Sequence, residues 1–110
     1  MRGELWTVAG GVYASKPRPA LIVQDDAFDD TDSVTVLPLT STAVDASLLR
    51  LTVTPTASNG LEHRSWIQID KVTTVRRTSL GHRIGKLDQV SMLDVERHLA
   101  AFLGFGRPAR

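Results

Sequence analysis

The stretch KPRPALIV, residues 16–23, decides how this chain can fold. Pro17 and Pro19 flank Arg18, and two prolines this close exclude a helix, because each lacks a backbone N–H and restricts the residue before it. The mostly apolar run over residues 20–24 has the length of one strand. The stretch therefore predicts an extended or turn-like segment that carries Arg18 and leads directly into a buried strand.

Further strand-like segments lie on both sides of this stretch. Apolar residues at alternating or consecutive positions predict strands over residues 4–8, 33–40, 49–54 and 65–70. Pro38 lies inside the second of these runs and indicates an edge strand or a bulge. Asn59-Gly60 is a strong turn signal, and residues 72–80 form a broken, basic, Thr-rich stretch.

A convincing helical pattern occurs only near the C-terminus. Asp88 is a suitable N-cap, and Gly104 is a suitable C-terminal stop. Apolar residues share one face of this helix: Met92, Val95, Leu99, Phe102 and Leu103. The sequence therefore predicts a mainly β fold, a small and strongly bent sheet or barrel with one C-terminal α-helix. We expect a single domain over residues 1–105 and a frayed tail over residues 106–110.

The composition excludes several kinds of chemistry. The chain has 110 residues and no cysteine, which rules out disulfides, thiol nucleophiles and cysteine-held metals and agrees with a reducing cytoplasm. No apolar run approaches the roughly 18 residues of a membrane span. The N-terminus does not have the pattern of a signal peptide. We therefore expect a cytoplasmic protein with no membrane partner.

The net charge of +1 conceals an uneven distribution. Residues 1–59 carry a net charge of −3, whereas residues 60–110 carry +4. From Lys71 to Lys86 there are five cations and no acid. Such asymmetry is typical both of a polyanion-binding surface and of a solvated basic face, and charge alone leaves the two open.

Two groups of titratable residues invite a metal or acid–base interpretation. Residues 25–32 contain five aspartates, but their spacing does not match a calcium-binding hand, so a solvated turn is favoured. His63, His82 and His98 lack metal-ligand spacing, and His98 falls within the predicted helix. His63 and His82 would serve as general bases only with a partner. The sequence predicts no metal site and no cofactor.

Four motifs follow one another along nearly the whole chain. Arg2-Gly3-Glu4-Leu5-Trp6 comes first, and Pro17-Arg18-Pro19 then precedes the apolar strand. The third motif is Val36-Leu37-Pro38-Leu39-Thr40-Ser41-Thr42. The fourth is Gln68-Ile69-Asp70-Lys71-Val72, followed by Thr78-Ser79-Leu80. In this order, and with a C-terminal helix that ends near Leu103, the chain resembles the MazF/PemK toxin family.

The resemblance implies a fold and a function. Family members form a small SH3-like barrel with a C-terminal helix, and they act as homodimers. They are metal-independent endoribonuclease toxins that cut single-stranded RNA at short sequences, leave 2′,3′-cyclic phosphate and 5′-hydroxyl ends, and are inhibited by a cognate antitoxin. The family's catalytic pair corresponds to Arg18 and Thr40. A guanidinium suits the role of phosphate clamp, and a hydroxyl suits that of hydrogen-bond donor, while the general base stays unassigned.

The resemblance also indicates where RNA would bind. Many members carry glycine and glutamine or glutamate just before the catalytic arginine, whereas residues 13–17 here read YASKP, so the family's RNA sequence preference does not carry over. We expect Tyr13 to stack on a base, and Trp6 and Trp66 to lie in the core or a dimer interface. Other RNA contacts are expected from Lys16, Ser41, Thr42, Asp70, Lys71, Arg76, Arg77 and Arg83.

Two other functions remain open at this point. CcdB-like toxins share the fold but bind DNA gyrase and catalyse nothing, and they lack this arrangement of arginine and threonine. A catalytically inactive relative that only binds an antitoxin or RNA is the other alternative. The sequence does not give the cleavage motif, the class of RNA or the identity of the antitoxin.

Overall fold

The computed structural model describes residues 1–10, 14–46 and 48–106, and these form one sheet and one long helix. Tyr13 and residues 107–110, most of the expected tail, lie outside the described residues. The strands are β1 (Glu4–Gly10), β2 (Ala14–Ile22), β3 (Ser33–Thr40), β4 (Arg50–Val53), β5 (Ser65–Gln68), β6 (Thr73–Arg76) and β7 (Leu80–Lys86). The helix is α1 (Gln89–Leu103), and three short 3-10 turns are η1 (Asp26–Phe28), η2 (Ile69–Lys71) and η3 (Arg77–Ser79).

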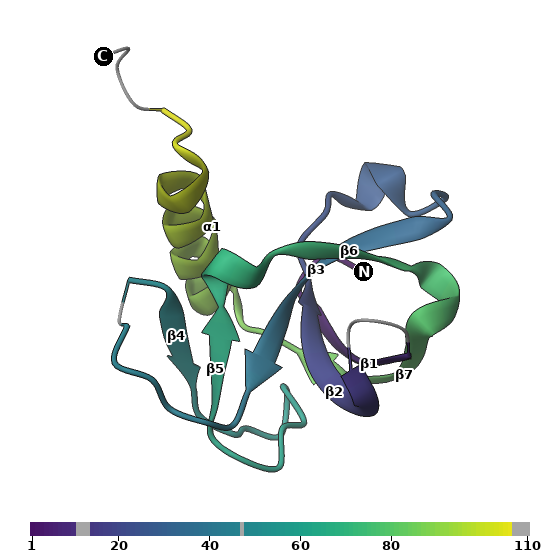
Figure 1. The fold of residues 1–110 in the computed structure, drawn as a ribbon, viewed down its shortest axis with the longest axis horizontal. Helices are drawn as coiled ribbons and strands as arrows, with labels where there is room; N and C mark the ends of the chain where they lie inside the picture. The colour runs from purple at the N-terminus through teal and green to yellow at the C-terminus, as the bar shows by residue number, and fades with distance from the viewer. Residues whose placement is uncertain (11–13, 47, 107–110) are drawn as a thin grey trace.

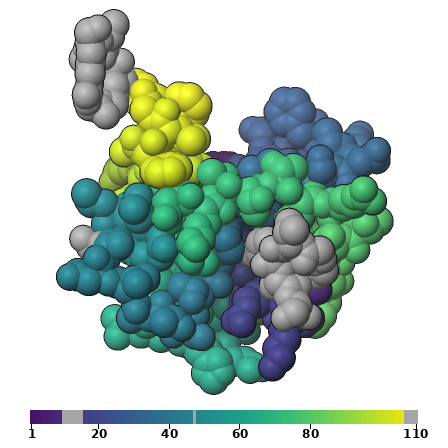
Figure 2. Space-filling model, in the orientation of Figure 1, coloured from purple at the N-terminus to yellow at the C-terminus, as the bar shows by residue number. Residues whose placement is uncertain are grey.

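The seven strands form one antiparallel sheet in the order β4-β5-β3-β2-β1-β7, with β6 paired to β3 beside this path (Figure 1). The sheet is bent but not closed, because no ladder among the described strands joins β4 to β7. This confirms the predicted bent antiparallel sheet with a C-terminal helix. On the surface, the last turns of α1 and the blue segment that follows β2 stand out as two separate projections (Figure 2).

Strand β3 changes its partners along its length. Its first half pairs with β6, its middle pairs with β2 from Val36 to Pro38, and its last two residues pair with β5. Pro38 therefore lies in an inner strand rather than at the sheet edge. Because it stands where one ladder ends and the next begins, its missing N–H interrupts no continuous run of hydrogen bonds.

The apolar strands β2 and β3 are covered on both faces. Leu21 and Leu37 belong to a larger core that also contains Met92 and Val95 of α1. Ala20, Ile22 and Val36 belong to a second cluster on the opposite face, against which Trp6 packs. Burial on both faces explains why residues 20–23 are apolar without alternation. It also places Trp6 against a core, as expected, whereas Trp66 belongs to neither cluster.

Helix α1 begins and ends at the predicted caps. The side chain of Asp88 accepts a hydrogen bond from the backbone N–H of Ser91 at 3.0 Å, and Gly104 adopts a left-handed conformation with φ of 79°. The predicted apolar face is only partly used, however. Met92 and Val95 are buried, but Phe102 and Leu103 are 46% and 45% exposed. The C-terminal turns of α1 extend beyond the sheet that covers its first turns (Figure 1).

Strand β7 has no counterpart among the predicted strands. Its sequence LGHRIGK contains two glycines and only two apolar residues, so it carries no alternating signal. The glycines are needed for close packing. A Cβ on Gly81 would lie 2.3 Å from Thr7 Oγ1, and a Cβ on Gly85 would lie 2.4 Å from the backbone of Asn59. The two glycines therefore remove the alternating pattern from the sequence and also allow the strand to pack closely.

We expect Asp88→Ala to lower the free energy of unfolding by about 1 kcal/mol at pH 7. The hydrogen bonds from Ser91, one of them from its Oγ at 2.6 Å, hold the pKa of the Asp88 carboxyl below its usual value. A depressed pKa stabilises the folded state above the unfolded value, and the benefit disappears as pH falls through the folded value. Urea unfolding at pH 7 and at pH 3 measures both effects.

The control for this cap is Asp94→Ala, in the middle of the same helix. The Asp94 carboxylate makes no hydrogen bond within the described residues; only its backbone oxygen is contacted, by His98 Nδ1. A stability difference between wild type and Asp88→Ala that did not shrink at acid pH would contradict the assignment of the cap.

No helix among the described residues is long and apolar enough to cross a membrane.

Candidate active site

Arg18 lies on an open edge of β2. It pairs with Val8 of β1 on one side, while the ladder to β3 stops at Ala20. The two flanking prolines are tolerated in β2 because this edge has no partner strand at their positions. The side chain is exposed, and its guanidinium forms no ion pair with any described carboxylate. A charged, unneutralised donor therefore stands at the surface in an extended backbone.

Thr40 is the last residue of β3 and is half-buried. Its Oγ1 accepts a hydrogen bond from the backbone N–H of Thr42 at 3.1 Å. Because a hydroxyl has one hydrogen and two acceptor positions, this contact leaves the Thr40 hydrogen free to be donated. The chain turns away from the sheet directly after this residue, which places the hydroxyl at the end of a strand rather than within a ladder.

The strand register relates these two residues. β2 and β3 pair Ile22 with Val36, Leu21 with Leu37 and Ala20 with Pro38. Two residues further along each strand, the same register would set Arg18 opposite Thr40. The ladder between β2 and β3 ends at Ala20 and Pro38, and beyond it β3 stays paired only with β5 on its other edge, so a gap replaces the ladder. Arg18 and Thr40 therefore stand on the two sides of an opening in the sheet.

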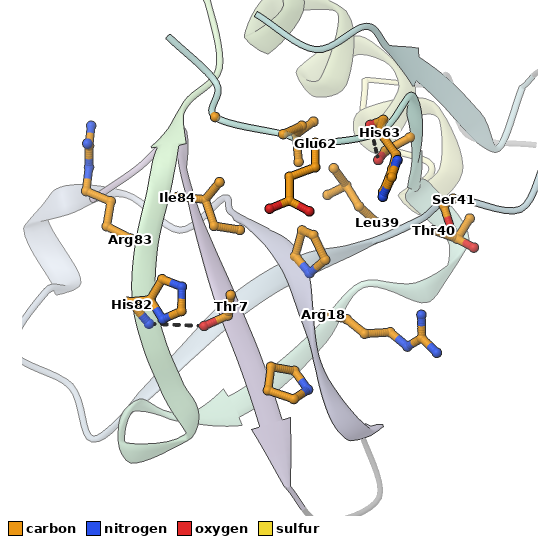
Figure 3. Close-up of a pocket in the computed structure, with 15 residues that line it drawn as sticks. Thr7, Arg18, Leu39, Thr40, Ser41, Glu62, His63, His82, Arg83 and Ile84 are labelled. Atoms are coloured by element: carbon orange, nitrogen blue, oxygen red, sulfur yellow. Dashed lines mark hydrogen bonds between the residues drawn. The ribbon is translucent and has the colours of Figure 1, made fainter. Parts of the chain in front are cut away.

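Two hollows meet at this opening. The first, of about 540 Å³, is lined by Arg18 and Thr40 together with β7 and the loop that follows Gly60. The second, of about 490 Å³, lies toward η2 and β6 and shares Arg18, Leu39 and Thr40 with the first. Figure 3 shows Arg18 extending toward the side where Thr40 and Ser41 lie. The pair thus occupies the junction of a groove with two arms.

Several residues predicted to bind RNA lie in this groove. Ser41 lines the first arm, and Thr42 and Lys71 line the second. Arg83 also borders the first arm, but its Nε pairs with Glu4 at 3.3 Å and its side chain points away from the hollow (Figure 3). Burial raises the pKa of Glu4, yet hydrogen bonds from Trp6 and Arg83 and nearby positive charge hold it below its usual value. This carboxylate therefore stays charged and retains Arg83.

Other predicted contacts lie elsewhere. Arg77 donates to the backbone oxygen of Thr31 at 2.8 Å and holds the acidic loop, and Arg76 borders the same region. Asp70 forms an ion pair with Arg50, so its carboxylate is already bound. Lys16 is exposed but lines neither arm of the groove. Tyr13 lies outside the described residues.

The groove also contains residues that were not among the predicted RNA contacts. Glu62 joins His63 and His82 in the first arm, and Gln68, Thr73 and Thr74 line the second. In Figure 3, Glu62 and His63 hang from the loop above the hollow, and His82 lies beside Thr7. No local motif marks these residues, because the loop and β7 meet only in the folded chain. His63 and His82 thus share one hollow, although they lie 19 positions apart.

The loop that carries Glu62 and His63 is fixed against β7. Asn59 is 4% exposed, and its side-chain oxygen accepts hydrogen bonds from the N–H groups of Thr56 and Leu61, both at 3.0 Å. Gly60 has a φ of 68°, and a Cβ there would lie 2.2 Å from the carbonyl oxygen of Ile84. The predicted Asn59-Gly60 turn is therefore a tightly packed wall of the site.

The arrangement suits chemistry on a phosphate group. A guanidinium offers a planar, permanently charged fork of donors that matches phosphoryl oxygens. A hydroxyl across the gap adds a second donor, and Lys71 adds charge along the second arm. Within the described ranges, no group of three or more His, Cys, Asp or Glu side chains is arranged to hold a metal ion.

Comparison with known proteins agrees with this geometry. Residues 1–103 match the family model described as PemK-like, MazF-like toxin of type II toxin-antitoxin system. A probable endoribonuclease MazF of Mycolicibacterium smegmatis is 52% identical over 104 residues, which cover 94% of this chain and 95% of that protein.

Solved structures share the fold. An endoribonuclease in complex with its cognate antitoxin, from a mycobacterial species, has a TM-score of 0.82 at 24% identity and covers 98% of each chain. The Mycobacterium tuberculosis toxin MazF-mt6 has a TM-score of 0.80 at 23% identity, over 94% of this chain and 99% of that one.

Fold, groove and relatives together define a toxin of the endoribonuclease class. The chain belongs to the PemK-like, MazF-like toxins of type II toxin–antitoxin systems. The resemblance stated from the four sequence motifs is thereby confirmed, and so is the fold, as a bent antiparallel sheet with a C-terminal helix that is not closed into a barrel.

Proposed function

We propose that the chain is a sequence-specific endoribonuclease that cuts single-stranded RNA without a metal ion, with Arg18 and Thr40 as its catalytic pair. The observation that carries this proposal is the position of the two residues beyond the end of the ladder between β2 and β3, at the junction of both arms of the groove. An RNA strand bound along the groove would place one of its phosphates at this junction. The 52% identity to a probable endoribonuclease supports the same reaction.

The reaction would be an internal transfer at phosphorus. The 2′-oxygen of one ribose attacks the adjacent phosphorus, the bond to the 5′-oxygen breaks, and a 2′,3′-cyclic phosphate and a 5′-hydroxyl result. Arg18 would hold the phosphoryl oxygens where negative charge accumulates, and Thr40 would donate its free hydrogen to one of them. Arg18 is not the general base, because a guanidinium keeps its proton in proteins.

The RNA would be bound mainly along the second arm. Lys71 supplies positive charge there, and Thr42, Gln68 and Thr74 supply hydrogen-bonding groups for splayed bases. Ser41 would contact the RNA beside the scissile phosphate. Lys16, on β2 two residues before Arg18, would meet a flanking phosphate. Each phosphate neutralised adds about 0.7 to the salt dependence of binding to a single strand.

We also propose that the protein forms a homodimer, is inhibited by a cognate antitoxin and acts in the cytoplasm. Exposed apolar side chains on α1 and directly after it support a covered surface there, because Phe102 is 46% and Phe105 is 69% exposed. A dimer would bury such side chains and add to the stability of a chain with a small core. Light scattering of the purified protein measures the oligomeric state.

The expected result for the purified protein is cleavage of a mixed RNA pool at one short motif in the presence of excess EDTA. Mapping the new ends should show 2′,3′-cyclic phosphates and 5′-hydroxyls, and a pool of single-stranded DNA should stay intact because it lacks the attacking hydroxyl. An uncut pool together with retention of DNA gyrase on a column of the protein would instead indicate a CcdB-like toxin. An uncut pool that is still bound would indicate an inactive relative.

A further inference from the structure

Trp66 lies beside Thr40 rather than in the core. It is the residue of β5 that pairs with Thr40 of β3, and on its other side it pairs with Thr52 of β4. Directly paired residues of antiparallel strands project from the same face, with Cβ atoms about 5 Å apart. The neighbouring pair, Leu39 and Ile67, projects into the core. Trp66 therefore stands on the outer face, next to the proposed catalytic hydroxyl.

The indole is partly exposed and is accompanied by a cation. Trp66 belongs to neither buried apolar cluster. The guanidinium carbon of Arg64 lies 5.6 Å from the centroid of its ring, within the range of a cation–π contact. Arg64 is itself exposed, and it pairs with none of the carboxylates that the structure describes. An aromatic ring with an unneutralised arginine over it is thus displayed one strand away from Thr40.

This combination suits an unpaired nucleobase. Bases of a single strand stack on aromatic rings and on guanidinium planes, and the attached phosphate is attracted to the arginine. Neither core packing nor an ion pair explains why a large aromatic residue and a free arginine occupy this surface. Because Trp66 is paired directly with Thr40, their Cβ atoms are about 5 Å apart, so the indole is within reach of a nucleotide whose phosphate lies at the proposed catalytic pair.

We propose that Trp66 and Arg64 form a base-stacking subsite for a nucleotide adjacent to the scissile phosphate. This inference rests on the proposed function, since it assumes that an RNA strand passes Thr40. The base would lie against the indole, and Arg64 would either cover its outer face or contact its phosphate. Stacking tolerates every base, so this subsite would contribute affinity and position rather than sequence preference.

The test uses binding without cleavage. A fluorescently labelled 12-nucleotide pool of random sequence, with every ribose 2′-O-methylated, has no hydroxyl to attack phosphorus. We expect it to quench tryptophan fluorescence in the wild type, and by a larger fraction in Trp6→Phe, whose remaining tryptophan is Trp66. Anisotropy titrations should show about 10-fold weaker binding for Trp66→Leu and less than a threefold change for Trp66→Phe, which keeps a ring.

The two side chains are separated by their salt dependence. Trp66→Leu removes no charge, so the slope of log affinity against log salt should stay as in the wild type. Arg64→Gln should lower this slope by about 0.7 if the arginine contacts a phosphate, whereas Arg97→Gln on the exposed face of α1 should not change it. An unchanged slope combined with weaker binding for Arg64→Gln would place the guanidinium on the base.

Equal binding of the pool by Trp66→Leu and wild type would overturn the subsite, as would the absence of quenching in Trp6→Phe. Thermal unfolding of each variant identifies a loss that comes from misfolding, and in that case the quenching experiment decides alone. A different result would disprove the proposed function. If the wild-type protein leaves natural RNA uncut, the proposed function is wrong, regardless of the binding results for the Trp66 variants. A wild type that cuts RNA but shows no role for Trp66 disproves only the subsite.

Discussion

Arg18→Ala should lower the rate of RNA cleavage by about 10²- to 10³-fold while leaving the protein folded. One preorganised donor to developing charge contributes about 3–4 kcal/mol to lowering a barrier of this kind. Arg18 is exposed, and no described carboxylate pairs with it, so its removal costs no ion pair among the described residues. Single-turnover cleavage of an RNA that contains the mapped motif, together with circular dichroism, measures both parts of this expectation.

The matched control is Arg97→Ala, which removes an exposed arginine from α1, away from the groove. It should cut RNA at the wild-type rate, and it corrects for the loss of one positive charge. Arg18→Lys adds a second comparison, because it keeps the charge but loses the planar fork, so it should recover only part of the rate. Wild-type cleavage by Arg18→Ala would remove this residue from the catalytic pair.

Gly60→Ala should lower the free energy of unfolding by about 3 kcal/mol, the largest stability effect that we expect from one added methyl group. Two causes combine. Gly60 has a positive φ of 68°, which costs a residue with a side chain about 1 kcal/mol, and the new Cβ would lie 2.2 Å from the backbone oxygen of Ile84. A backbone atom cannot turn aside as a flexible side chain does, so β7 or the loop must move.

Gly104→Ala separates the two causes. Gly104 has a similar φ of 79°, but no atom lies within 4 Å of the position where its Cβ would be. It should therefore show only the conformational cost, about 1 kcal/mol. Urea unfolding compares the two variants directly. Equal destabilisation would mean that the loop is not wedged against β7, and the position of Glu62 and His63 in the groove would lose its explanation.

Arg18 and Thr40 were proposed as a catalytic pair through the family resemblance, whereas the first strands and the C-terminal helix could be predicted from local signals. The two prolines around Arg18, the apolar run after it and the caps at Asp88 and Gly104 each report on their own neighbourhood. Strand β7 was missed because its glycines serve partners distant in sequence: Gly85 packs against the backbone of Asn59, 26 residues earlier, and Gly81 packs against Thr7. Close packing against residues distant in the chain produces no periodic pattern of apolar residues in the sequence.

The sequence predicted only part of the groove lining. Clustered charge between Lys71 and Lys86 suggested one continuous basic surface, but the fold distributes those residues. Arg77 turns to the acidic loop, Arg83 pairs with Glu4, and Lys71 is left in the groove. Which partner an arginine meets depends on contacts distant in sequence, so charge counts alone could not decide it. The same reason applies to Trp66, whose neighbour Thr40 is set by strand pairing.

The register of β2 and β3 has a consequence for control of the protein. Three consecutive residue pairs, from Ile22–Val36 to Ala20–Pro38, set the register that places Arg18 across the opening from Thr40. The relative position of the two proposed catalytic residues is therefore set when the sheet forms. In the nuclease that we propose, a neutralising partner would then act by covering the groove rather than by rearranging these two strands.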